Sequence, residues 1–159
     1  MSNDPYTPPS APVRDRSPEP AGSTWKAVTF GVLADVCATF LGGIALFAVM
    51  GSFLVSQGAS PEDLDASLAG SDLTQLLGVT LGLCCTVLGG YVTGRVARQR
   101  EYYHALLTGI VVLLIGEIMV STSPDGTPLA TRIIGDILVI PAALLGAYFC
   151  KSARLRAEA

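Results

Sequence analysis

Residues 28–55 read VTFGVLADVCATFLGGIALFAVMGSFLV and contain one charged side chain, that of Asp35. An α-helix crosses the roughly 30 Å hydrocarbon core of a bilayer with about 20 residues, so this stretch is long enough to span a membrane. The apolar core of a secretory signal has only about 7–15 residues and lies close to the N-terminus, whereas this run begins after Trp25 and Lys26. The stretch therefore predicts a helix that stays in the membrane.

The composition of the whole chain agrees with this prediction. Of its 159 residues, 50% are hydrophobic and 14% are charged, and the mean hydropathy is +0.53. A soluble domain has about 25% charged residues, so this chain has too few charges to cover a surface in water, and a lipid bilayer is the expected surrounding. The net charge is -3, and no basic stripe exists outside the helix ends, so nucleic acid is not an expected partner.

Three further apolar segments follow, at residues 73–94, 105–120 and 133–150. Each approaches the length of a spanning helix once its flanking residues are included, and none shows the alternation of a strand. We therefore expect an all-α membrane protein with a four-transmembrane-helix bundle in residues 25–152. The expected helices cover residues 27–56, 73–95, 103–121 and 131–151.

Two segments outside these helices have a distinct composition. Residues 1–24 contain six of the ten prolines and no apolar period, which predicts a disordered N-terminal tail. After the first apolar segment, Ser60 followed by Pro61 resembles a helix start. This pattern predicts a short surface helix near 61–68 that ends at Gly70.

The distribution of positive residues predicts the orientation. Nine of the ten Lys and Arg residues lie around the tail, in the connection between the second and third helices, or near the C-terminus: Arg14, Arg16, Lys26, Arg95, Arg98, Arg100, Lys151, Arg154 and Arg156. Four spans place these three regions on one side of the membrane, and positive residues mark the cytoplasmic side. We expect a multi-pass membrane protein, with the tail and residues 153–159 in the cytoplasm.

The second apolar segment carries a small residue at every fourth position: Gly78, Gly82, Thr86, Gly90 and Gly94. Lipid tails are as apolar as leucine, so membrane helices associate through close backbone contact, which small residues permit. We expect this helix to form the centre of the bundle. Its stripe of small residues is expected to contact the first helix or a second copy of the chain.

The same helix ends in Gly-Gly-Tyr-Val-Thr-Gly-Arg-Val-Ala at residues 89–97, followed by a basic turn and His104. Together with the acidic loop after the first helix and Pro141 in the fourth, this run resembles a type of uncharacterised bacterial four-helix inner-membrane protein. The resemblance extends over residues 28–150. It implies a multi-pass protein of a bacterial inner (plasma) membrane with this four-helix architecture, and it supplies no catalytic residue or ligand.

Three carboxylic acids fall inside the apolar segments: Asp35, Glu117 and Asp136. A charge at the bilayer centre costs on the order of 2.5–3.5 kcal/mol by insertion scales, so we expect these side chains to face the bundle. Asp35 is expected either to serve a function or to pair with a basic residue of the neighbouring turn: Arg95, Arg98 or His104.

Glu117 and Asp136 both lie toward the outer ends of their helices, which leaves two interpretations open. Two close carboxylates cannot both ionise cheaply, so they can share a proton. Alternatively, Arg132 precedes Asp136 by four residues and offers an ordinary ion pair along the helix. His104, at the start of the third helix, is interpreted either as a titrating group or as a polar anchor at the interface.

Nothing in the sequence indicates an enzyme, a metal site or a cofactor. The four cysteines lie in apolar segments without metal-ligand spacing: Cys37, Cys84, Cys85 and Cys150. With a single histidine and no phosphate-binding or nucleophile motif, the chain lacks the residues that such sites require.

Two functions remain as hypotheses. The first is a non-catalytic inner-membrane protein that acts by helix association with itself or with another membrane protein, as the glycine stripe suggests. The alternative is a small oligomeric channel or proton-linked transporter that uses the intramembrane carboxylates.

Overall fold

The computed structural model describes residues 23–69, 71–122 and 129–158. Within these ranges the regular secondary structure is helical and contains no strand. The elements are α1 (Thr24–Ser56), η1 (Pro61–Asp63), α2 (Leu64–Ala69), α3 (Asp72–Ala97), α4 (Glu101–Thr122) and α5 (Leu129–Glu158). Four of them, α1, α3, α4 and α5, are long and apolar enough to cross a membrane. The prediction of an all-α chain with four such helices is confirmed.

The observed helix ends lie within three residues of the predicted ends, with one exception. Helix α5 continues from the predicted end at residue 151 to Glu158, through most of the segment that was expected to follow the helix. The predicted disordered tail covers residues 1–24. Residues 1–22 lie outside the described residues, and Thr24 already belongs to α1.

The connection between α1 and α3 contains the predicted short helix, as η1 followed directly by α2. The Glu62 backbone N–H donates to the Ser60 hydroxyl oxygen at 3.3 Å, so Ser60 caps this helix as its sequence position suggested. The predicted end at Gly70 lies outside the described residues. Helix α3 then starts at a second cap, in which the Thr74 N–H donates to the Ser71 hydroxyl at 3.4 Å.

The four long helices run alternately up and down, with α3 at the centre in contact with α1, α4 and α5. The prediction that the second apolar segment forms the centre is therefore confirmed. The start of α1 meets the start of α4, where Thr24 contacts His104. The ends of α3 and α5 meet at the same end of the bundle, where Arg154 donates to the Arg98 carbonyl.

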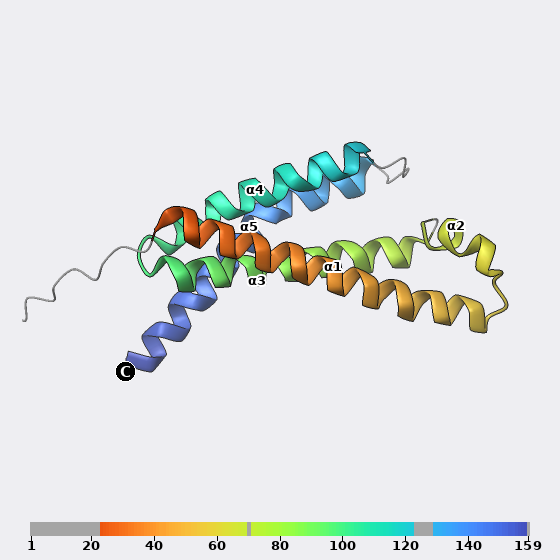
Figure 1. Cartoon of the computed structure of the whole chain (residues 1–159), viewed down its shortest axis with the longest axis horizontal. Helices are drawn as coiled ribbons and strands as arrows, with labels where there is room; N and C mark the ends of the chain where they lie inside the picture. Colours follow the sequence, from red (N-terminus) through yellow and green to blue (C-terminus); the bar gives the residue numbers. More distant parts are fainter. Residues whose placement is uncertain (1–22, 70, 123–128, 159) are drawn as a thin grey trace, which may run out of the picture.

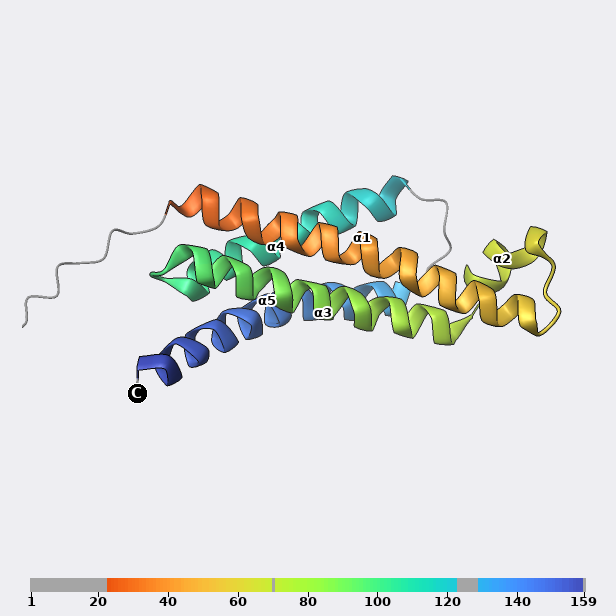
Figure 2. The same cartoon turned by 60° about the horizontal axis from the view of Figure 1, so that its bottom comes forward.

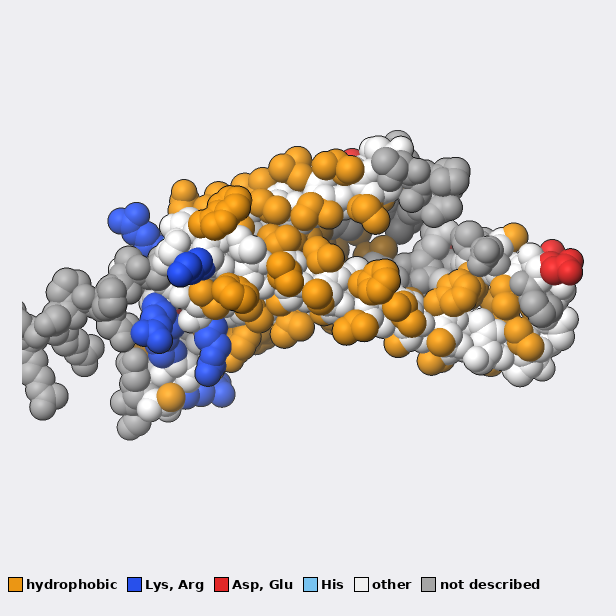
Figure 3. All heavy atoms as spheres, viewed as in Figure 1, with side chains coloured by type: hydrophobic (Ala, Val, Ile, Leu, Met, Phe, Trp, Pro, Cys, Tyr) orange, Lys and Arg blue, Asp and Glu red, His pale blue; other side chains and the backbone are white. Residues whose placement is uncertain are grey.

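Positive side chains gather at this end, as the face seen in Figure 3 illustrates. We call it the basic end; its residues are Lys26, Arg95, Arg98, Arg100, Lys151, Arg154 and Arg156. The opposite end, which holds η1 and α2 and the exposed carboxylates of Glu62, Asp63 and Asp72, is called the acidic end.

The bundle is closed at the basic end and open at the acidic end. Figure 1 shows α1 and α3 leaving α4 and α5 at an angle, so that the two pairs diverge toward the acidic end. The space-filling view shows a hollow between the two arms on that face (Figure 3). A cavity between the arms is lined by residues of all four long helices, and it forms the candidate site described below.

Small residues rather than large apolar ones make up the closed half. Its fully buried positions are mainly alanine and threonine, while large apolar side chains such as Phe40, Leu41 and Ile137 are more than 60% exposed. This arrangement is the reverse of a soluble protein and is expected of a protein whose outer surface meets lipid.

The closest approach joins α3 to α5 through two glycines. A Cβ atom built on Gly90 would overlap the Ala143 carbonyl group, and one built on Gly146 would lie 2.6 Å from the Tyr91 backbone nitrogen. Helix α1 approaches α3 in the same manner, because a Cβ on Gly31 would lie 2.9 Å from the Gly89 carbonyl oxygen. Backbone contacts between helices therefore hold the closed half together.

The predicted stripe of small residues divides at its middle. Gly90 contacts α5 at Ala143, and Gly94 lies against Cys150 of the same helix, with 3.2 Å between its built Cβ and the Cys150 Cβ. Gly78 and Gly82 face open space, with nothing within 4 Å of a built Cβ. The stripe does not form one continuous interface within the chain, because α3 separates from α5 in the open half, whereas α1 stays beside it there, with Leu81 of α3 close to Gly42 of α1.

Candidate functional site

The candidate site is a groove of about 560 Å³ between the two arms of the bundle. Most of its lining consists of glycine and aliphatic side chains of α1, α3, α4 and α5, with Phe40 and Met119 among them. The polar residues of the lining are Asp35, Thr39, Thr86, Arg132 and Asp136. A groove of this size, mostly apolar and with a few convergent polar groups, has the properties of a small-molecule site.

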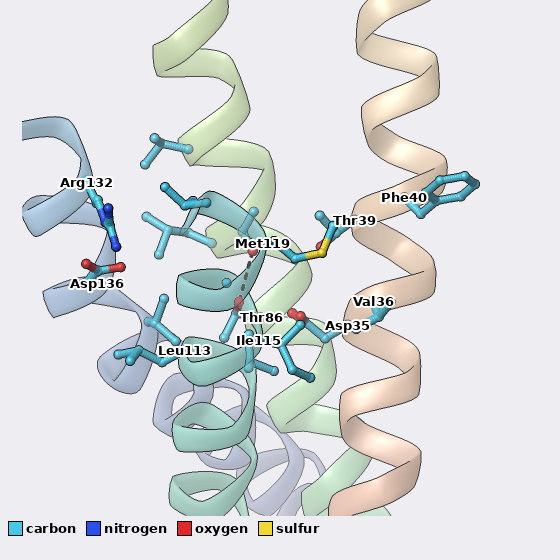
Figure 4. Close-up of a pocket in the computed structure, with 18 residues that line it drawn as sticks. Asp35, Val36, Thr39, Phe40, Thr86, Leu113, Ile115, Met119, Arg132 and Asp136 are labelled. Carbon is cyan, nitrogen blue, oxygen red and sulfur yellow. Dashed lines mark hydrogen bonds between the residues drawn. The ribbon is translucent and has the colours of Figure 1, made fainter. Parts of the chain in front are cut away.

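Asp35 lies at the end of the groove nearest the closed half. Its side chain is only 4% exposed, because α1 comes close to α3 here: a Cβ on Gly89 would lie 2.9 Å from the Asp35 Cβ. Within the described residues, the Oδ1 atom of Asp35 has no hydrogen-bond partner. The Thr86 hydroxyl lies beside the Asp35 carboxyl and also donates to the Gly82 carbonyl at 3.0 Å (Figure 4).

The expected basic partners of Asp35 are engaged elsewhere or lie away from it. His104 contacts Thr24, which precedes Asp35 by three helical turns, and its other ring nitrogen lies 3.0 Å from the Arg100 carbonyl oxygen. Arg95 is exposed and donates to the Tyr91 hydroxyl at 3.4 Å, and Arg98 ends α3 at the basic end. The prediction of an ion pair at Asp35 is wrong, because Asp35 lies deeper along α1 than the basic turn.

Arg132 and Asp136 line the opposite wall of the groove, on α5 (Figure 4). The guanidinium of Arg132 forms a two-point ion pair with Glu117 of α4, in which Nε donates to Oε1 at 3.2 Å and Nη2 donates to Oε2. Asp136 lies beside this pair, close to both Arg132 and Glu117. The structure thus brings Glu117 and Asp136 together, which is the arrangement that one of the two interpretations requires. The hydrogen-bonded ion pair of Arg132 is with Glu117 of the neighbouring helix, and Asp136 of its own helix lies beside that pair.

A group of buried hydroxyls lies between Asp35 and the basic end, and the sequence interpretation did not include it. The hydroxyls of Thr93 and Thr108 lie 2.9 Å apart between α3 and α4, and both residues are almost completely buried. Each hydroxyl lies within hydrogen-bonding distance of a backbone carbonyl one turn earlier, those of Gly89 and His104. The sequence contains one indication: Thr108 follows His104 by four residues, on the same face of the helix.

Together with His104, these residues form a column of buried polar residues. It begins at His104, beside the exposed Thr24, and continues to Thr93 and Thr108. Gly31 of α1 lies against Thr93, one helical turn before Asp35 on the same helix. His104 is thus part of the buried interior, with 5% exposure. The column connects the basic end of the bundle to the neighbourhood of Asp35.

No group of three or more His, Cys, Asp and Glu residues could hold a metal ion in the described part of the chain. All four cysteines are free thiols, with Cys85 and Cys150 buried. Comparison of the chain with protein-family models, with curated proteins and with solved structures gives no match. The resemblance carried by residues 89–97 stays a prediction.

The charges of the groove are unbalanced. The single guanidinium of Arg132 forms an ion pair with Glu117 and also attracts Asp136 beside it, whereas Asp35 forms no ion pair among the described residues. The surroundings of both aspartates are mostly apolar. A carboxylate in such surroundings is stabilised either by a proton or by a positively charged ligand.

Proposed function

We propose that this chain is a multi-pass membrane protein that binds small hydrophobic cations in the groove, as a proton-linked carrier. The observation that carries the proposal is the position of Asp35, buried at one end of an apolar groove with Oδ1 unpartnered. The apolar surface of a hydrophobic cation would contact the aliphatic lining, and its positive charge would pair with the carboxylate. The volume of about 560 Å³ lies within the range of roughly 300–1,000 Å³ that such ligands occupy.

The same carboxylate supplies the link to protons. When Asp35 is ionised, the groove attracts a cation; when it is protonated, that attraction is lost. A proton and a cation therefore compete for one group, so release of either favours binding of the other. The buried polar residues His104, Thr93 and Thr108 lie between this group and the basic end, from which a proton would reach Asp35.

We further propose that the basic end faces the cytoplasm of a bacterium, with both termini there. The support is the positive-inside distribution, since the starts of α1 and α4 and the ends of α3 and α5 share that end. A cysteine at Gln99 should react with a membrane-impermeant maleimide only after the membrane is opened, whereas one at Glu62 should react in intact cells. The reverse pattern would invert the orientation.

The second candidate function is non-catalytic helix association with a second copy or with another membrane protein. It is favoured by the glycines that face open space in the acidic half, Gly78 and Gly82 on α3 and Gly43 and Gly51 on α1. Such positions allow another helix to approach closely.

Filling the groove tests the carrier proposal. Gly82 lines the groove and has nothing within 4 Å of a built Cβ, so Gly82→Leu should fold and yet occupy the ligand space. We expect its affinity for tetraphenylphosphonium, measured with the purified protein in nanodiscs, to fall at least about tenfold. The leucine side chain would fill part of the groove, so the ligand would lose apolar contact equivalent to at least one or two buried methylene groups.

Gly43→Leu is the matched control, because Gly43 also faces open space but does not line the groove. It should bind the cation as the unmodified chain does. Equal binding by all three proteins would contradict a ligand site in the groove. Helix association would be favoured instead by two results together. The unmodified chain would bind no cation but form a dimer in crosslinking, and Gly82→Leu would lose that dimer.

A further inference from the structure

A second depression, of about 320 Å³, lies at the basic end between the last turns of α3 and α5. Three guanidinium groups line it, those of Arg95 and Arg98 from α3 and Arg154 from α5. The rest of its lining consists of small residues, Cys150, Ala153 and Ala157. The depression is separate from the groove described above and shares no residue with it.

The local backbone explains why these side chains meet. Helix α3 ends at Ala97, and the next residue, Arg98, caps it in a left-handed conformation with φ of 57° that turns the chain toward α4. Helix α5 continues as a helix past the bundle, as Figures 1 and 2 show, so Arg154 still lies beside the end of α3. Small residues on α5 leave the space between the two helix ends open.

Arg154 is held in place by two contacts. Its Nη1 atom lies 2.9 Å from Oε1 of Glu101, whose side chain is only 9% exposed, and donates to the Arg98 carbonyl at 2.8 Å. Arg95 has one neutral partner, the Tyr91 hydroxyl. Among the described side chains that line or contact the depression, three guanidinium groups outnumber one carboxylate, that of Glu101.

We propose that this depression binds a phosphate group, supplied by the headgroup of an anionic phospholipid or by a soluble phosphate. Guanidinium groups match phosphate oxygens with paired hydrogen bonds, and several of them that share one space repel each other until an anion enters. The site lies where the apolar parts of α3 and α5 end, which is the level of lipid headgroups in a bilayer. The proposal depends on the three arginines and not on the cation groove.

The test compares the two phosphate sources on the full chain. The unmodified protein in a neutral detergent is titrated with phosphatidylglycerol, with phosphatidylcholine or with inorganic phosphate, and both lipid retention by native mass spectrometry and the thermal unfolding midpoint are recorded. We expect phosphatidylglycerol to be retained and to raise the midpoint, because a ligand that binds the folded state stabilises it. A rise with inorganic phosphate alone would assign the site to a soluble phosphate.

The variants Arg95→Gln and Arg98→Gln remove one guanidinium each and leave the Arg154–Glu101 pair intact. Each should weaken binding at least about tenfold, the effect of losing one charged hydrogen bond. Arg156→Gln removes the same charge from the same end but does not line the depression, and it should bind as the unmodified chain does. Equal weakening by all three variants, or no preference for phosphatidylglycerol or phosphate over phosphatidylcholine, would overturn the proposal.

Discussion

Replacement of Gly90 by leucine should prevent the closed half of the bundle from forming. A side chain at this position must enter the space of the Ala143 backbone on α5, and a backbone atom cannot move aside as a flexible side chain can. Overpacking of a core typically costs about 1–3 kcal/mol and occasionally more, and a loss at or above the upper end is expected here because two backbones would have to separate. The expected result is a chain without a cooperative thermal transition in detergent, measured by circular dichroism and size-exclusion chromatography.

Gly78→Leu provides the control within the same helix and the same stripe. A Cβ on Gly78 meets nothing within 4 Å, so this variant should keep its thermal midpoint close to that of the unmodified chain. Gly146→Leu, on the other side of the contact, should behave like Gly90→Leu. If the variants at 78 and 90 lost stability equally, the division of the stripe into a packed half and an open half would be contradicted.

The second large effect is expected at Asp35. Asp35→Asn keeps the shape of the side chain and removes its negative charge, so the groove should lose its attraction for a cation. We expect the affinity for tetraphenylphosphonium to fall at least about tenfold, as for the loss of one charged contact. In the unmodified chain the affinity should rise with pH, because protons compete for the same carboxylate; in the variant this dependence should disappear.

Asp72→Asn makes the same change at an exposed position at the start of α3, outside the groove, and should alter neither the affinity nor its pH dependence. In proteoliposomes, a pH gradient should drive uptake of the cation by the unmodified chain and by the Asp72 variant only. Unchanged binding by Asp35→Asn would remove the basis for a proton-linked carrier.

The sequence is sufficient to predict the four long helices because a membrane imposes a length on each apolar segment. An apolar run as long as residues 28–55 fits a membrane-spanning helix, and its polar flanks mark where that helix ends. The predicted bounds of the helices therefore agree closely with the observed ones. The caps at Ser60 and Ser71 are local features, since each depends on hydrogen bonds within three residues. Local chemistry also explains the position of the short helix between them.

The groove depends on the relative angles of the helices, which no local pattern determines. Arg132 lies within reach of Asp136 along α5, yet it pairs with Glu117 because α4 and α5 place that carboxylate directly opposite it. In a helix that is apolar on all sides, the sequence does not mark which side is buried. For this reason Gly78 and Gly90 hold equivalent positions in the sequence pattern, although only Gly90 contacts another helix.

The unequal lengths of the two arms have a consequence for the surrounding bilayer. From Thr24, which contacts His104, α1 continues for 32 residues to Ser56, whereas α4 continues for only 18 residues from His104 to Thr122. At 1.5 Å per residue, α1 extends roughly 20 Å further than α4, and Figure 2 shows this difference at the acidic end. The outer turns of α1 are apolar and exposed, with Phe53 at 52%.

A bilayer of uniform thickness matched to α4 would leave these outer turns in water. The hydrophobic mismatch is relieved if α1 tilts, if the lipid around it thickens, or if two long arms shield each other. Each route has a modest energetic cost that depends on membrane thickness. The chain is therefore expected to be more stable, and less prone to cluster, in nanodiscs of long-chain lipids than in those of short-chain lipids.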